Sequence, residues 1–138
     1  FEKFKEKGYL FANFVHPKIK IWESTKLGEN IFILEDNTIQ PNTCIGNNTV
    51  FWSGNHLGHH SIVGSHCFIS SHVVISGHCK IEDNSFIGVN ATLHDEIIVG
   101  QESLIGAGAI ITKSTKEKSV YIPSPTKPFP KTSDMLNF

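Results

Sequence analysis

The sequence is poor in features that define several common protein classes. Charged residues make up only 18% of its 138 residues, and the formal net charge is −1 with a pI near 6.8. The lysines are scattered, apart from those near the two ends. Because phosphate contacts need clustered basic side chains, we expect no binding of nucleic acid.

Long hydrophobic runs and paired cysteines are also missing. No stretch approaches the roughly 18 apolar residues of a membrane-spanning helix, and no leader-like segment is visible. We therefore expect no membrane span and a cytoplasmic protein. Cys44, Cys67 and Cys79 form neither a CxxC pair nor an even set, so we expect reduced thiols without a disulfide framework.

What the sequence does have is a six-residue period between Val15 and Lys116. Every sixth residue from Val15 to Ile111 is aliphatic or aromatic, without exception. The residue four places later is usually small or β-branched, and glycine often follows the aliphatic residue, as at Gly64 and Gly88. Neither the period of an α-helix nor the alternation of a single strand produces this pattern.

A six-residue period fits a chain that winds around a three-sided prism, with one short strand and one corner per hexapeptide. Residues three hexapeptides apart then stack at about 4.8 Å, the usual spacing of neighbouring strands. Seventeen hexapeptides predict an all-β solenoid of just under six coils, with Cys67 and Cys79 in small inward positions.

The repeat divides the chain into three parts. Residues 1–14 are expected to form a cap over the open end of the solenoid, made of a helix end terminated by Gly8 and a short strand. Residues 15–116 form the solenoid domain. Residues 117–138 form an irregular, Pro-rich tail, whose apolar side chains we expect to pack back against a coil or a neighbouring molecule.

Histidines crowd the stretch GNHLGHHSIVGSHCFISSH, residues 54–72. One repeat position, a corner three residues after the inward aliphatic residue, is occupied by His60, His66, His72 and His78. Corners favour Asn, Asp, Gly and His, which tolerate unusual backbone angles, so turn formation explains most of the crowding. His59 and His60 are harder to explain this way, because they follow an unusually polar turn, WSGNH, with Asn55 in a normally small or apolar position.

The pattern [Ile/Leu/Val]-Gly-x-x-[small]-x resembles the repeat of the hexapeptide-repeat acyltransferases over about 100 residues. This resemblance implies a left-handed parallel β-helix. The segment WSGNHLGHHSIVG is further similar to the stretch N-T-G-x-x-x-D-H-D-x-x-I-G of a sugar acyltransferase group. That group includes sialic acid O-acetyltransferase and the UDP-4-amino-sugar N-acetyltransferases. The similarity to this group implies that the chain transfers acetyl from acetyl-CoA to a sugar or nucleotide-linked amino sugar in bacterial surface glycan synthesis.

The resemblance places the catalytic histidine of that group on His59, while its flanking acidic residues are replaced by Gly58 and His60. A neutral imidazole, with a pKa of about 6.5, suits the removal of a proton from an attacking amine or hydroxyl. We therefore expect His59 to act as general base with His60 as the second catalytic candidate. Asn55 and His56, from the polar turn, are expected to contact the acceptor.

The acetyl donor is expected to bind a different set of residues. A second histidine of the group falls on Phe68, with His66 nearby, and PSPTK at residues 123–127 resembles its G-x-P-A-K tail. The resemblance places coenzyme A in a groove between subunits, lined by small residues. The expected donor-binding residues are His66, Phe68, Ser70, Gly88, Gly106, Ala107, Lys113 and Lys127. No metal site is expected.

Two other functions are open at this point. A gamma-class carbonic anhydrase holds zinc with three histidines across a subunit interface. Two of its ligands lie five residues apart, a separation that no histidine pair here has. A non-catalytic solenoid scaffold would present a regular outward ladder of one residue type, whereas the outward positions here are mixed.

One outward column is nevertheless apolar throughout. It consists of Phe32, Val50, Phe68, Phe86 and Leu104. Soluble monomers rarely expose such a stripe to water, and threefold symmetry buries one edge of each copy, so we expect a homotrimer. The resemblance also implies that an N-terminal nucleotide-binding domain precedes a chain of this kind.

Overall fold

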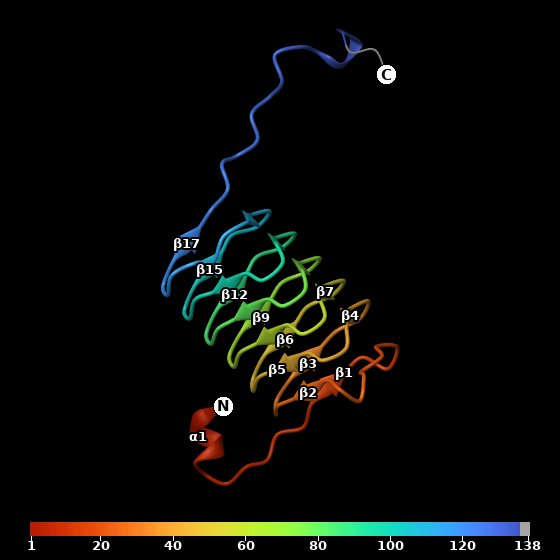
Figure 1. Ribbon diagram of the computed structural model, residues 1–138, viewed down its shortest axis with the longest axis vertical. Coiled ribbons are helices and arrows are strands. Elements are labelled where there is room, and N and C mark those ends of the chain that lie inside the picture. The colour runs from red at the N-terminus through yellow and green to blue at the C-terminus, as the bar shows by residue number, and fades with distance from the viewer. Residues whose placement is uncertain (136–138) are drawn as a thin grey trace.

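The computed structural model describes residues 1–135, and residues 136–138 of the expected tail lie outside this range. Three parallel sheets run along a three-sided prism (Figure 1). The all-β class is confirmed: the chain is a parallel β-solenoid of about six turns, of the left-handed β-helix type. Within residues 1–135, neither α1 (Glu2–Lys5) nor the 3₁₀ helix η1 (Ser133–Met135) has the length or apolarity to cross a membrane.

The strands are two residues long and form three faces of the prism. The apolar face contains β1 (Phe14–Val15), β3 (Phe32–Ile33), β6 (Val50–Phe51), β9 (Phe68–Ile69), β12 (Phe86–Ile87), β15 (Leu104–Ile105) and β17 (Val120–Tyr121). The second face contains β4 (Thr38–Ile39), β7 (His56–Leu57), β10 (Val74–Ile75), β13 (Thr92–Leu93) and β16 (Ile110–Ile111). The third face contains β2 (Lys26–Leu27), β5 (Cys44–Ile45), β8 (Ile62–Val63), β11 (Lys80–Ile81) and β14 (Ile98–Val99).

Each strand from β1 to β16 turns its second residue inward and its first residue outward, as strand alternation requires, whereas both residues of β17 are exposed. The inward residues from Ile33 to Ile111 are almost fully buried, and burial of each such side chain contributes about 1.5–3 kcal/mol. The small or β-branched position is also inward, and it is buried at every repeat from Ile31 to Thr115. Cys67 and Cys79 lie in this position as free thiols, as expected.

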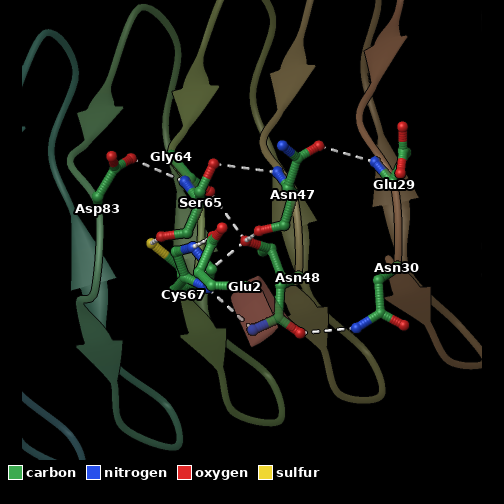
Figure 2. Close-up of polar contacts among 11 residues, drawn as sticks. Glu2, Glu29, Asn30, Asn47, Asn48, Gly64, Ser65, Cys67 and Asp83 are labelled. Carbon is green, nitrogen blue, oxygen red and sulfur yellow. Dashed lines mark hydrogen bonds and ion pairs between the residues drawn. The ribbon is translucent and has the colours of Figure 1, made fainter. Parts of the chain in front are cut away.

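The corners explain the choice of Asn and His. Every sixth residue from Asn30 to Glu102 that is not glycine has a positive φ, between 53° and 62°. This left-handed region is most accessible to Gly, Asn, Asp and His, so the expected corner role of the histidines is confirmed. Side chains next to the corners also link successive coils. In Figure 2, Asn47 and Ser65 each donate a backbone N–H to the side chain one coil further on, Ser65 Oγ and Asp83 Oδ1.

The two ends of the solenoid depart from the strict repeat. No strand forms around Ile21 in the first coil, where Trp22 Nε1 instead donates to the Ile39 carbonyl at 2.9 Å. At the other end, β17 continues the apolar face past the expected boundary at Lys116. It pairs Val120 with Leu104, a separation of 16 residues where the other rungs have 18.

The terminal segments lie differently from what we expected. Gly8 has a φ of 83° and follows α1, as expected. Yet α1 does not cover the open end, because it lies along the side of the prism, where Lys5 pairs with Glu29 and Glu2 with His66. The first part of the tail packs back as expected, because β17 pairs with β15. From 122 to 135 the described residues are all exposed, and the chain extends away from the last rung (Figure 1).

Candidate active site

Three imidazoles meet at one edge of the prism, which we call the histidine edge. The edge is formed by the turns that follow β7 and β10 and lead to the third face. His59 and His60 lie on the first turn and His78 on the second. The rings of His60 and His78 are stacked with centroids 4.8 Å apart, and the His59 ring meets both of them edge-on, at 5.3 and 5.0 Å. All three side chains are exposed.

His59 differs from its neighbours because its backbone is not in the left-handed region. Its N–H donates to Gln40 Oε1 at 2.8 Å, and its carbonyl accepts the His78 N–H at 2.9 Å. Its imidazole lies directly over Gly77, where a Cβ would come within 2.9 Å of Cε1 and 3.0 Å of Nε2. The absence of a side chain at Gly77 therefore provides the space that the His59 ring fills.

A short chain of polar contacts runs from His59 to the preceding coil. His59 Nδ1 lies 3.1 Å from His60 Nδ1, and His60 Nε2 lies 3.1 Å from Asn42 Nδ2. Asn42 Nδ2 can only donate, so in this orientation of the amide neutral His60 accepts at Nε2, carries its proton on Nδ1 and donates to His59 Nδ1. With the Asn42 amide turned over to present Oδ1, His60 Nε2–H donates to it, His60 Nδ1 accepts from His59 Nδ1–H, and the lone pair of His59 Nε2 is free to accept a proton.

The two expected acceptor contacts are placed very differently. Asn55 is 1% exposed, and its side chain is used inside the coil: Nδ2 donates to the Trp52 carbonyl and Oδ1 accepts the Val73 N–H. A residue buried in this way cannot touch a substrate without unfolding its turn, so Asn55 belongs to the core. His56 is half-buried on the outside of β7, next to the histidine edge.

Four expected donor-binding residues lie on a different edge, between the apolar and second faces. Ser70, Gly88, Gly106 and Ala107 follow β9, β12 and β15 there, and we call this the glycine edge. Coils approach closely at this edge, since a Cβ on Gly88 would lie 2.6 Å from the Ala107 nitrogen. Beside Ser70 is a shallow hollow of about 230 Å³, lined by Trp52, Phe68, Ser70, Ser71 and Val89.

The remaining donor-binding candidates are spread around the molecule. His66 lies under α1, with Nε2 3.1 Å from Glu2 and Nδ1 2.9 Å from Asn48 Nδ2 (Figure 2 shows Asn48 and Glu2). Lys113 follows β16 and lies in the same column as His59, three coils away. Lys127 is exposed, in the irregular segment that follows β17. A single copy therefore does not bring the donor-binding candidates to His59.

Two residues of the histidine edge were not singled out as functional by the sequence reasoning. His78 reaches the His59–His60 pair because it lies one coil, or 18 residues, after His60. Gly77 likewise lies one coil after His59, whose ring it accommodates. The 18-residue separation was the available signal, because residues 18 apart in sequence stack on neighbouring coils of the solenoid.

Comparison with known proteins gives a family and a fold. The family model of the GMPPB C-terminal domain matches residues 11–121. No protein of the curated collection matches the chain. A mutant of perosamine N-acetyltransferase from Caulobacter crescentus, in complex with CoA and GDP-perosamine, is similar with a TM-score of 0.85 and 21% identity. This similarity covers 91% of the present chain and 60% of that one.

Two further solved structures have the same fold. The acetyltransferase domain of PglB from Neisseria gonorrhoeae FA1090, in complex with acetyl coenzyme A, gives a TM-score of 0.85 at 21% identity, over 93% of this chain and 62% of that one. WeeI from Acinetobacter baumannii AYE gives 0.70 at 20% identity, over 91% and 62%. The chain thus spans about three fifths of the length of these structures, and the expected hexapeptide-repeat acetyltransferase fold is confirmed.

Proposed function

The chain belongs to the family of the GMPPB C-terminal domain, and we propose that it is the acetyl-transfer part of a sugar acetyltransferase that uses acetyl-CoA. The acceptor is a sugar or nucleotide-linked amino sugar. The observation that carries this proposal is the placement of His59, an exposed imidazole seated over Gly77 that no turn of the solenoid requires. The fold shared with acetyltransferases solved with CoA and GDP-perosamine supports it.

In the proposed reaction, His59 Nε2 removes the proton from the acceptor amine or hydroxyl as that group attacks the acetyl carbonyl. The C–S bond of the thioester then breaks, and His59 returns the proton to the departing CoA thiolate. His60 is a positioning residue: its Nδ1, at 3.1 Å, accepts the Nδ1–H of His59 and so holds His59 in the tautomer whose Nε2 is free. In this state the Asn42 amide, whose Nδ2 lies 3.1 Å from His60 Nε2, is turned over so that its Oδ1 accepts the Nε2–H of His60.

We place the acetyl donor on the glycine edge. The hollow at Trp52, Phe68 and Ser70 offers apolar surface for a pantetheine arm. Further along the edge, the small exposed side chain of Ala107 leaves room for the rest of the donor, and we call this path the donor groove. Because this edge and the histidine edge are different corners of one prism, we propose that each active site combines the glycine edge of one copy with the histidine edge of another.

A homotrimer supplies that arrangement. The first residues of the strands on the apolar face, which include Phe32 at 43%, Phe86 at 41% and Leu104 at 39% exposure, form an outward stripe along the prism. The other two faces mix such residues with polar ones, for example Lys80 on the third face and Thr92 on the second. A closed threefold assembly removes the apolar stripe of every copy from water.

The test of the base is acetyl-CoA turnover by His59→Ala on nucleotide-linked amino sugars. We expect kcat to fall by about 10² to 10⁴-fold, the usual contribution of a positioned base, with acetyl-CoA affinity nearly unchanged. His94→Ala is the matched control, because His94 is also an exposed histidine without a positive φ, and it follows β13, about two coils beyond His59. Normal turnover by His59→Ala would remove His59 from the mechanism.

The test of the shared site is complementation between two inactive variants. His59→Ala lacks the base, and Ala107→Trp blocks the donor groove with a large exposed side chain. When both are unfolded and refolded together, mixed trimers contain some sites made from an intact glycine edge and an intact histidine edge, and activity should return. A mixture as inactive as its two components would place donor and base on a single copy.

A non-catalytic solenoid is the second candidate, and one observation favours it. His60 and His78 each have the positive φ that a corner requires, so turn formation is a sufficient reason for two of the three histidines. Acetyl-CoA binding separates the two functions, because a scaffold has no use for the donor. Absence of binding at millimolar acetyl-CoA would favour the scaffold.

A further inference from the structure

The histidine edge has the composition and geometry of a metal site. We propose that His59, His60 and His78 of one copy bind a single divalent transition-metal ion, with Zn²⁺ as the probe. The inhibition described below rests on the proposed function of His59, but the binding itself does not.

The three imidazoles already converge in one chain. One ring nitrogen from each lies within 4.8 Å of the corresponding nitrogens of the other two. The closest pair, the Nδ1 atoms of His59 and His60, is 3.1 Å apart. Two nitrogens that each lie about 2.0–2.1 Å from a tetrahedral zinc are about 3.3 Å apart, so this pair is nearly at its ligand spacing. Rotation of exposed side chains brings the third nitrogen into reach.

The backbone around the three ligands is held in place by the solenoid. The His78 N–H donates to the His59 carbonyl at 2.9 Å, and the His60 N–H to the Pro41 carbonyl at 3.3 Å. The ligands therefore start from neighbouring rungs of a rigid ladder, and little order has to be created on binding. Exposure of all three side chains leaves a fourth coordination position free for water or another ligand.

Imidazole ligands determine which ions fit. Neutral imidazole suits Zn²⁺, Cu²⁺, Ni²⁺ and Co²⁺, whereas Mg²⁺ and Ca²⁺ prefer oxygen ligands. Coordination by His59 Nδ1 ends its contact with His60 Nδ1 and leaves the one imidazole proton on Nε2, the nitrogen that must be free to act as base. A bound ion should therefore inhibit acetyl transfer.

Isothermal titration calorimetry with ZnCl₂ tests the proposal. The full-length protein is used after removal of any polyhistidine tag and of bound metal by a chelator. We expect one Zn²⁺ per chain and no response to MgCl₂. His60→Asn and His78→Asn should each weaken the binding by at least about tenfold, since a ligand is lost while Asn keeps the positive-φ corner. His72→Asn, at a corner on the glycine edge, should bind Zn²⁺ as the wild type does.

Two outcomes overturn the site: fewer than one Zn²⁺ bound per chain at saturation, or equal affinity in wild type and His78→Asn. Circular dichroism and thermal unfolding establish that each variant is folded. If His78→Asn is unfolded, the visible spectrum of Co²⁺ bound to the wild type takes its place, and a spectrum without tetrahedral bands refutes the site. Zn²⁺ binding without any acetyl transfer refutes the proposed function alone, whereas acetyl transfer unaffected by bound Zn²⁺ refutes the inhibition.

Discussion

Gly77→Ala is expected to damage catalysis while leaving the fold intact. The added methyl would lie 2.9 Å from His59 Cε1 and 3.0 Å from Nε2, whereas ordinary contact begins near 3.4 Å. The atoms it meets belong to an exposed side chain, so the ring moves by about half an ångström and the backbone does not. A misplacement of 1 Å costs on the order of 10²-fold in rate, and we therefore expect kcat to fall by about tenfold.

The assay is steady-state acetyl transfer, with thermal unfolding measured in parallel. The free energy of unfolding should stay within about 1 kcal/mol of the wild type, because Gly77 has no positive φ to strain. A double-mutant cycle with His59→Ala isolates the cause: once the imidazole is absent, Gly77→Ala should have no further effect on kcat. An unchanged kcat in the single variant, or an equal loss in both backgrounds, would refute this explanation.

Four further predictions concern the solenoid itself. The proposed homotrimer predicts that Phe68→Glu on the apolar face reduces the mass in light scattering from three copies to one, whereas Ile98→Glu on the third face, where Ile98 is 45% exposed, leaves the mass at three copies. Gly58→Ala should lower the free energy of unfolding by about 1–3 kcal/mol in chemical denaturation, because its methyl would lie 2.5–2.6 Å from the backbone of the next coil. Burial raises the pKa of Cys67 from 9.0 to about 11, so at pH 8 iodoacetamide should modify the half-buried Cys44 first, as read by mass spectrometry. The same shift predicts that the free energy of unfolding falls between pH 9 and 11, where the unfolded thiol ionises and the folded one does not, and that Cys67→Ala reduces this fall.

The fold could be predicted almost completely because the hexapeptide period specifies each strand and corner locally. From Leu27 to Ile111 the inward residues follow the expected register, since each coil repeats the same contacts with the next. The ends could not be predicted in the same way, because a terminal segment has a coil on one side only. Thus α1 settles beside His66 through ion pairs and aromatic contacts that have no periodic signature.

The candidate site was only partly predictable, for a related reason. A period assigns a residue to an edge, but it does not say which side chains on that edge touch. Asn55 illustrates the difference, since its polarity suggested a substrate contact while the structure uses it to hydrogen-bond the coil to Val73. His78 shows the converse, because its regular corner position concealed a ring stacked on that of His60.

The histidine edge therefore contains more histidine side chains than the fold of its turns requires. Corners elsewhere use Asn at the same backbone angle, as at Asn42 and Asn84, so His60 and His78 are replaceable as turn residues. His59 has no such backbone role, and the ring occupies its place only because position 77 has no side chain. Since a turn explains neither the ring of His59 nor the space left for it, this pair of residues is the strongest structural reason to expect chemistry at this edge.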